Sequence, residues 1–242
     1  MSATNSELLV NRDGHVVGLT LNRPAKRNAL STSLASALRR ALTELADDES
    51  VRAVVIFGAG PTWCAGVDLQ ALQSDDPVEA AAVDDPGLAN TLRTMPQPCI
   101  AAINGGCITG GLELALSCDV RIASPDAFFA DTHTQLGVTP VWGMTELLVR
   151  AVGDSRAREM SFTGNPVDAA TALDIGLISR VVPADELETV AYRLAAQIGE
   201  NDPRAVQAIK QIYAREHAVR SALDEEQATM RELGDPSVSR RS

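Results

Sequence analysis

The chain has 242 residues, of which 45% are hydrophobic and 22% charged, ordinary values for a globular protein with a full core. This composition excludes a disordered chain, a collagen and a small disulfide scaffold. The formal net charge of −11 makes nucleic acid and anionic membrane surfaces poor partners, because both would repel the protein at long range. A small anionic ligand can still bind where a local basic cluster and backbone N–H groups receive it.

The N-terminal stretch and the four cysteines favour a cytoplasmic protein without a bound metal. Residues 1–17 lack a basic region followed by an apolar run, and no run approaches the roughly 18–20 apolar residues of a membrane span. The cysteines form no C-x-x-C pair, and no His-x-x-x-His spacing accompanies them, so we expect no zinc site. We expect reduced, mostly buried thiols at Cys64, Cys99, Cys107 and Cys118.

The first sixty residues predict a strand, a helix and a second strand. Residues 15–22 (HVVGLTLN) are rich in β-branched and apolar residues and end in an Asn-Arg-Pro turn. Apolar residues then recur at three- and four-residue steps up to residue 46, which predicts a helix capped by Ser31 or Thr32. Residues 51–60 (VRAVVIFGAG) form a continuous apolar run between turn residues, which is typical of a strand buried on both faces.

The rest of the chain continues this alternation and then becomes helical. A loop is expected at residues 61–70, an acidic surface excursion at 73–87 and a buried strand at 99–104. A helix follows from the second glycine pair of GGCITGG, and DVRIAS and AFFAD predict two further short strands. Beyond Trp142 we expect mostly helices, each ended by glycine or begun near proline. The pattern predicts an α/β protein with helices that cover a mostly parallel sheet.

The glycine-rich turn at residues 104–113 (NGGCITGGLE) is the most informative segment of the chain. It lacks the Lys-Ser/Thr of a phosphate-binding P-loop and the G-x-G-x-x-G spacing of a dinucleotide site. A carboxylate at Glu113, in the first helical turn, would also repel a phosphate; it suits a proton-transfer role beside a carbonyl that becomes anionic. If Gly110 supplies one N–H and the loop at residues 64–68 another, the two form an oxyanion hole.

Several segments together resemble the crotonase, or enoyl-CoA hydratase/isomerase, superfamily. They are LNRPAKRNALS (21–31), WCAGVDL (63–69), IAAINGGCITGGLELALSCDVRIAS (100–124), AFFADTHTQLGVTP (127–140) and FTGNPVDAATALDIGLI (162–178). The resemblance implies a spiral of ββα units followed by a helical C-terminal part, assembled as a homotrimer or a hexamer. It places a crotonase-fold core at residues 1–185 and a helical trimerisation region of the same functional unit at 186–242.

The resemblance also implies an acyl-CoA thioester substrate and an enolate oxyanion. CoA is then part of the substrate, so no separate cofactor and no metal are expected. Val67 and Gly110 match the residues whose main-chain N–H groups form the oxyanion hole. Residues matching the loop that borders the adenine and pantetheine of CoA are Ala65, Val67, Asp68 and Leu69. Lys26, with Arg23 and Arg27 beside it, matches the turn that helps receive the CoA phosphates.

One catalytic position departs from the family pattern. Hydratases of this family use two glutamates; Glu113 matches the first, but His133 stands at the second. Imidazole titrates near pH 6.5 and can act as acid or base. The leading hypothesis is hydration of a 2-enoyl-CoA by Glu113 and His133. The alternatives are a double-bond isomerase that needs one glutamate, another crotonase-type lyase or hydrolase, and an acyl-CoA-binding protein without turnover.

Other candidate residues have weaker support. Trp63 and Trp142 suit either an acyl pocket or the core. Asp119 suits a structural carboxylate better than a catalytic one. Lys210 is a candidate contact with the CoA of a neighbouring subunit, as the family's assembly suggests.

Overall fold

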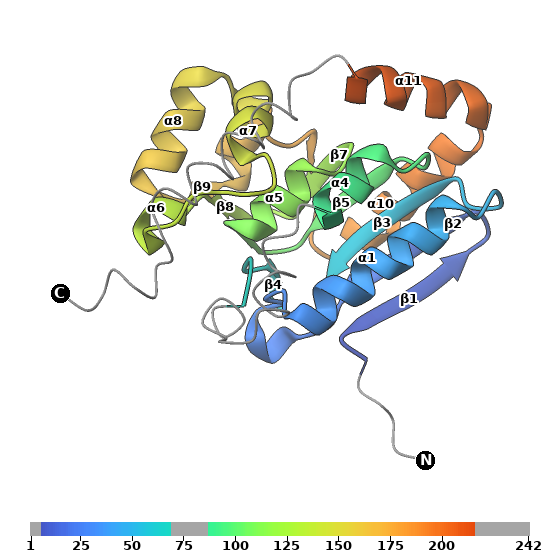
Figure 1. Ribbon diagram of the computed structural model, residues 1–242, viewed down its shortest axis with the longest axis horizontal. Helices are drawn as coiled ribbons and strands as arrows, with labels where there is room; N and C mark the ends of the chain where they lie inside the picture. Colours follow the sequence, from blue (N-terminus) through green and yellow to red (C-terminus); the bar gives the residue numbers. More distant parts are fainter. Residues whose placement is uncertain (1–5, 69–86, 216–242) are drawn as a thin grey trace.

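The computed structural model describes residues 6–68 and 87–215, and a six-stranded sheet forms its centre (Figure 1). The first two strands pair antiparallel, and all other neighbours in this sheet pair parallel. In spatial order the strands are β1 (Leu8–Asp13), β2 (Val16–Leu21), β3 (Ala53–Gly58), β5 (Cys99–Ile103), β7 (Val120–Ala123) and β10 (Arg180–Val181).

A second, smaller sheet contains the strands that follow β3, β5 and β7 along the chain. Its strands are β4 (Thr62–Cys64), β6 (Gly106–Ile108), β8 (Phe128–Ala130) and β9 (Val167–Asp168). β5 leads into β6 and then α5 (Gly110–Leu116), and β7 leads into β8 and then α6 (His133–Leu136). These repeated ββα units confirm the α/β protein that the pattern predicts and the spiral that the family resemblance implies.

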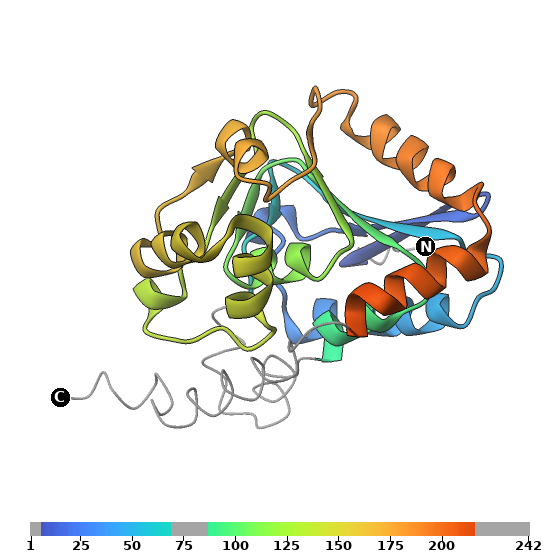
Figure 2. The ribbon, with the colours of Figure 1, turned by 90° about the horizontal axis from the view of Figure 1, so that it is seen from above.

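Helices cover both faces of the six-stranded sheet (Figure 2). α10 (Leu187–Gly199) packs on one face, against alternate residues such as Val55 and Ile100. α1 (Thr32–Ala46) and α4 (Gly87–Thr94) pack on the opposite face, and α11 (Pro203–Arg215) lies beside α4. α5 and α9 (Ala169–Asp174) pack on the smaller sheet, and α7 (Met144–Val152) packs against α5 and α8 (Asp154–Thr163). α10, from the predicted C-terminal region, thus shares the core of the sheet.

Most of the elements predicted from the sequence are confirmed. Ser31 is the N-cap of α1, and its hydroxyl accepts a hydrogen bond of 3.2 Å from the backbone N–H of Leu34. β1, β4 and β6 were not predicted: β4 lies inside the expected loop 61–70, and β6 inside the glycine-rich turn. β4 and β6 are short and lie among turn residues and glycines, which conceal them, and β1 exposes nearly its whole length.

Two further predictions have different outcomes. The four cysteines are free and buried, as predicted, and burial raises the pKa of the Cys64 and Cys99 thiols to about 12. The acidic stretch 73–87 lies almost wholly outside the described residues, and Leu69 lies outside them as well. Within the described ranges, no helix is long and apolar enough to cross a membrane.

Candidate active site

One cavity of about 400 Å³ brings together nearly all the residues that the sequence predicts for the site. It lies between the 3₁₀ turn η1 (Pro24–Lys26), the loop after β4, the start of α5 and the segment from α6 to Trp142. The predicted residues that line it are Lys26, Ala65, Val67, Asp68, Gly110, Glu113 and His133, with Arg27 beside them. Leu69 stays a prediction because it is not among the described residues.

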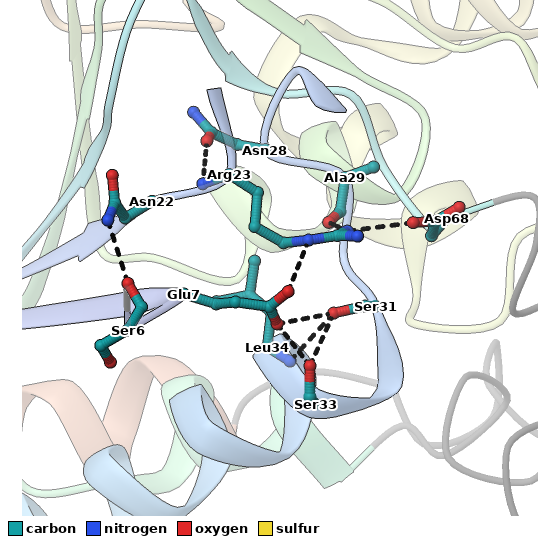
Figure 3. Close-up of polar contacts among 10 residues, drawn as sticks. All are labelled: Ser6, Glu7, Asn22, Arg23, Asn28, Ala29, Ser31, Ser33, Leu34 and Asp68. Carbon is teal, nitrogen blue, oxygen red and sulfur yellow. Dashed lines mark hydrogen bonds and ion pairs between the residues drawn. The ribbon is translucent and has the colours of Figure 1, made fainter. Parts of the chain in front are cut away.

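The basic turn is held in place by Asn28 and Arg23. Arg27 and Asn28 both adopt φ of 53°, and the buried Asn28 amide donates to the carbonyl oxygens of Ala59 and Thr62 at 2.8 and 2.7 Å. The Arg23 guanidinium contacts Glu7 at 2.8 Å and Asp68 at 3.0 Å (Figure 3). Arg23 therefore anchors the turn to its surroundings, contrary to the expectation that it receives phosphate. Lys26 and Arg27, both exposed at the cavity, fit that role.

Glu7 connects Arg23 to the start of α1. Its carboxylate accepts hydrogen bonds from the hydroxyls of Ser31 and Ser33, as Figure 3 shows. Burial alone would raise the pKa of Glu7, but these hydrogen bonds and the charge of Arg23 lower it. The ionised carboxylate ties β1, the basic turn and the N-terminus of α1 together.

The backbone amides of Val67 and Gly110 lie next to each other at the cavity wall. Val67 forms a parallel β-bridge with Leu30. In this bridge the N–H of Leu30 donates to the carbonyl oxygen of Gly66 at 2.8 Å, and the N–H of Asp68 donates to the carbonyl oxygen of Leu30 at 3.0 Å. In this geometry the N–H of Val67 turns to the opposite side, toward α5. Gly110 is the first residue of α5, where an N–H has no partner within the helix. Neither amide donates a hydrogen bond to any described residue.

Two glycines allow these amides to approach. A Cβ on Gly111 would lie 2.3 Å from the carbonyl oxygen of Cys64. Gly66 adopts φ of +90°, and a Cβ there would lie 3.0 Å from the N of Gly110. A side chain at either position would separate the loop after β4 from the start of α5, so the close approach of the two amides depends on both glycines.

Glu113 points from the first turn of α5 toward the segment that follows α6. Only 2% of its surface is exposed. Oε1 accepts a hydrogen bond of 2.8 Å from the backbone N–H of Trp142, and Oε2 lies 3.5 Å from Nε2 of His133. The backbone bond of Trp142 fixes one carboxylate oxygen, so the other faces the imidazole.

The imidazole of His133 lies between two carboxylates. Nδ1 is 2.6 Å from Oδ1 of Asp131, on the side away from Glu113. Burial alone would lower the pKa of His133, but its hydrogen bonds to Asp131 and Glu113 and their charges raise it to about 9. Burial likewise opposes ionisation of Asp131, yet the contacts with His133 lower the pKa of that carboxyl. His133 is therefore an imidazolium at neutral pH.

Asp131 is the residue that sequence reasoning missed. Its position in Asp131-Thr132-His133 was visible, but a carboxylate two residues before a histidine is a common arrangement. The contact between Thr109 and Thr132 was not predicted either. Their hydroxyls form a hydrogen bond with each other, and the N–H of Thr109 donates to the carbonyl oxygen of Ala130 at 2.8 Å. Thr109 adopts φ of 53°, which is unusual for a β-branched residue. This pair joins the start of α5 to the Asp131–His133 segment.

The weaker candidates are also resolved by the structure. Trp63 is a core residue whose indole N–H donates to Ile56 at 3.2 Å, whereas Trp142 lines the cavity. Asp119 is structural, as expected, since its carboxylate bonds the N–H of Cys99 at 2.7 Å and the ammonium of Lys210 at 2.8 Å. The expectation for Lys210 was wrong, because its buried ammonium also bonds two carbonyl oxygens of its own chain at 2.9 Å.

Comparison with known proteins gives consistent matches. The family model described as Enoyl-CoA hydratase/isomerase matches residues 11–235. The 2,3-dehydroadipyl-CoA hydratase of Escherichia coli strain K12 is 39% identical over 225 residues, covering 91% of this chain and 88% of that protein. The mitochondrial Delta(3,5)-Delta(2,4)-dienoyl-CoA isomerase of Rattus norvegicus is 37% identical over 228 residues, covering 87% and 69%. The crystal structure of an enoyl-CoA hydratase from Mycobacterium smegmatis has a TM-score of 0.83 and 42% identity, covering 94% and 98%.

Proposed function

Because this chain belongs to the enoyl-CoA hydratase/isomerase family, we propose that it adds water across the double bond of 2-enoyl-CoA thioesters. The observation that carries the proposal is the pair formed by Glu113 and His133. Their facing atoms lie 3.5 Å apart in the cavity whose wall also holds the amides of Val67 and Gly110. An acid–base pair beside two main-chain donors is what addition to a conjugated thioester requires.

The cavity offers a place for each part of the substrate. The thioester oxygen would accept hydrogen bonds from Val67 and Gly110. Lys26 and Arg27 would receive the CoA phosphates and so supply local positive charge on a protein of net charge −11. The loop that includes Ala65 and Asp68, and in our proposal Leu69, would border the CoA moiety. Because CoA belongs to the substrate, the proposed reaction needs no separate cofactor and no metal.

The proposed chemistry uses both groups of the pair. The Glu113 carboxylate takes a proton from water while the water oxygen bonds to the β-carbon. The electrons of the double bond move toward the thioester oxygen, and the two amides stabilise the resulting enolate. The imidazolium of His133 then gives its Nε2 proton to the α-carbon. Finally the proton on Glu113 passes to Nε2 of His133, which restores both groups after the net addition of one water molecule.

The test is turnover of 2-enoyl-CoAs of several chain lengths, followed as loss of the conjugated-thioester absorbance. We expect Glu113→Gln to lower kcat by about 10²–10⁴-fold, the usual contribution of a positioned acid or base. Glu44→Gln, an exposed change on α1, is the matched control and should leave kcat unchanged. Equal rates for wild type and Glu113→Gln at every chain length would refute hydration.

Double-bond isomerisation is the second candidate. Glu113 lines the same cavity as the two amides, and one carboxylate can move a proton from the α- to the γ-carbon or back. The similarity to a dienoyl-CoA isomerase also favours it. Supplying 3-enoyl-CoA and measuring conjugation separates the two reactions. Calorimetric binding of CoA thioesters without any product would instead indicate a binding protein.

We also propose assembly into a homotrimer or a hexamer. Apolar side chains are exposed on neighbouring elements of one region, with Phe162 at 71% on α8, and Phe128 and Leu173 each at 40%. A groove of about 530 Å³ lined by Phe128 and Met160 lies in the same region. Exposed apolar surface of this kind is typical of subunit interfaces. Light scattering after size exclusion should give three or six times 25.6 kDa, and a monomer would refute the assembly.

A cytoplasmic location completes the proposal. Four free, buried cysteines are compatible with a reducing compartment. Fractionation of cells that express the chain, with immunodetection, would test it, and recovery outside the cytoplasm would contradict it.

A further inference from the structure

The carboxylate of Asp131 is deeply buried and accepts hydrogen bonds from the ring and the backbone of His133. Only 2% of the residue is exposed. Oδ1 accepts from the ring Nδ1 of His133 at 2.6 Å and from the backbone N–H of the same residue at 3.2 Å. The side chain of Ser161, on α8, also bonds to this carboxylate. A carboxylate is costly to bury unless hydrogen-bond donors surround it, so these donors stabilise the buried carboxylate of Asp131.

These contacts decide which way the imidazole points. Because Asp131 binds Nδ1, the ring presents Nε2 to Glu113, at 3.5 Å. The bond from the His133 backbone to the same carboxylate oxygen ties the ring to its own main chain, which restricts rotation of the side chain. The other charged groups around the same cavity are Lys26, Arg27 and Asp68, and no hydrogen bond or ion pair joins them to the ring among the described residues.

We propose that Asp131 is a positioning residue for His133, which it holds as an imidazolium with its Nε2–H directed at Glu113 and the reacting carbons. The catalytic part of this inference rests on the proposed function. Asp131 is not among the described residues that line the cavity, and in this proposal it acts only through the ring. Without it, His133 would lose its anionic partner at Nδ1, and burial would then favour a neutral ring that cannot act as the acid.

The first test needs no substrate. Side-chain NMR of the full chain would follow the titration of His133 in the wild type and in Asp131→Asn. We expect the midpoint to fall from about 9 toward the ordinary value near 6.5, by at least about one pH unit. Asp126→Asn, an exposed carboxylate before β8, is the matched control and should leave the midpoint unchanged. An unchanged midpoint in Asp131→Asn would overturn the inference.

The second test is the pH profile of hydration. A fall of one unit leaves about a quarter of the rings as imidazolium at pH 8.5 and nearly all of them at pH 6.5. The ratio of wild-type to Asp131→Asn kcat should therefore be about threefold larger at pH 8.5 than at pH 6.5 for a fall of one unit, and more than about tenfold larger for a fall of two units. In a His133→Gln background, Asp131→Asn should change kcat less than about twofold, because the imidazole through which Asp131 acts is absent. A constant ratio across pH, or a full loss in that background, would refute the positioning role.

The two tests separate this inference from the proposed function. If the NMR midpoint shifts but no enoyl-CoA is hydrated, the proposed function fails while Asp131 still sets the charge of His133. If hydration proceeds and neither midpoint nor profile moves, the inference fails alone. Should Asp131→Asn fold poorly, Ser161→Ala removes one donor from Asp131 and keeps the carboxylate. That variant should leave the midpoint within a few tenths of a unit, and a fall as large as one unit would contradict the direct role of Asp131.

Discussion

A methyl group on Gly110 tests the two-amide arrangement directly. In Gly110→Ala the new Cβ would lie 3.3 Å from both the backbone N and the Cγ2 of Val67. Contacts this tight force the neighbour to move by a few tenths of an ångström, so the two N–H groups would no longer converge on one oxygen. Loss of one oxyanion-hole donor costs about 10²–10³ in rate, or about 3–4 kcal/mol of transition-state stabilisation.

The same substitution should leave the fold intact. Gly110 begins a helix, where alanine is favoured over glycine by up to about 1 kcal/mol, which offsets the tight contacts. The adjacent Gly111→Ala is the contrasting variant, because its Cβ would lie 2.3 Å from a backbone oxygen of Cys64 that has no room to move. We expect Gly111→Ala to lose about 3 kcal/mol of unfolding free energy.

The assay compares both variants by kcat with a 2-enoyl-CoA and by unfolding in urea. Gly110→Ala should fold like the wild type and lose about 10²–10³ in kcat. If it hydrates at the wild-type rate while remaining folded, the two amides do not hold the thioester oxygen, and the reasoning about the site is wrong.

Three further predictions concern stability. The pKa of His133 is raised in the folded state, so the folded chain holds the imidazolium proton more tightly than the unfolded chain does. The free energy of unfolding should therefore fall by about 3 kcal/mol as the pH rises from 6.5 to about 9. Urea titrations at several pH values should show this fall, and His133→Gln should not show it. Arg23→Met removes the ion pairs of Arg23 with Glu7 and Asp68 and should lower the unfolding free energy by about 2 kcal/mol, a loss that urea unfolding would show and that a wild-type midpoint would disprove. Lys210→Met removes the ammonium group from Asp119 and from two carbonyl oxygens and should cost about 3 kcal/mol, with faster amide hydrogen exchange in α11; unaltered exchange there would contradict its anchoring role.

The comparison of Arg23 with Lys26 shows where sequence reasoning stops. The two cations lie in the same short turn and look equivalent as phosphate ligands. The structure separates them because Glu7 and Asp68, which are distant in sequence, fold onto Arg23 and leave Lys26 at the cavity. Lys210 shows the same limit, since its partners come from the turn after α4 and from the residue that precedes β7. Long-range ion pairs leave no local pattern to read.

The sequence by itself determined the buried strands, the capped helix α1, the start of α5 at Gly110 and the family to which the motifs belong. Each of these depends on periodicity, turn residues or the order of short motifs, which are local properties of the chain. Only the tertiary structure decided that Glu113 and His133 face each other, that Asp131 binds the far side of the ring, and that the imidazole is charged. The protonation state of a buried group depends on distances to a few charges and on exclusion of water, and both exist only once the chain has folded.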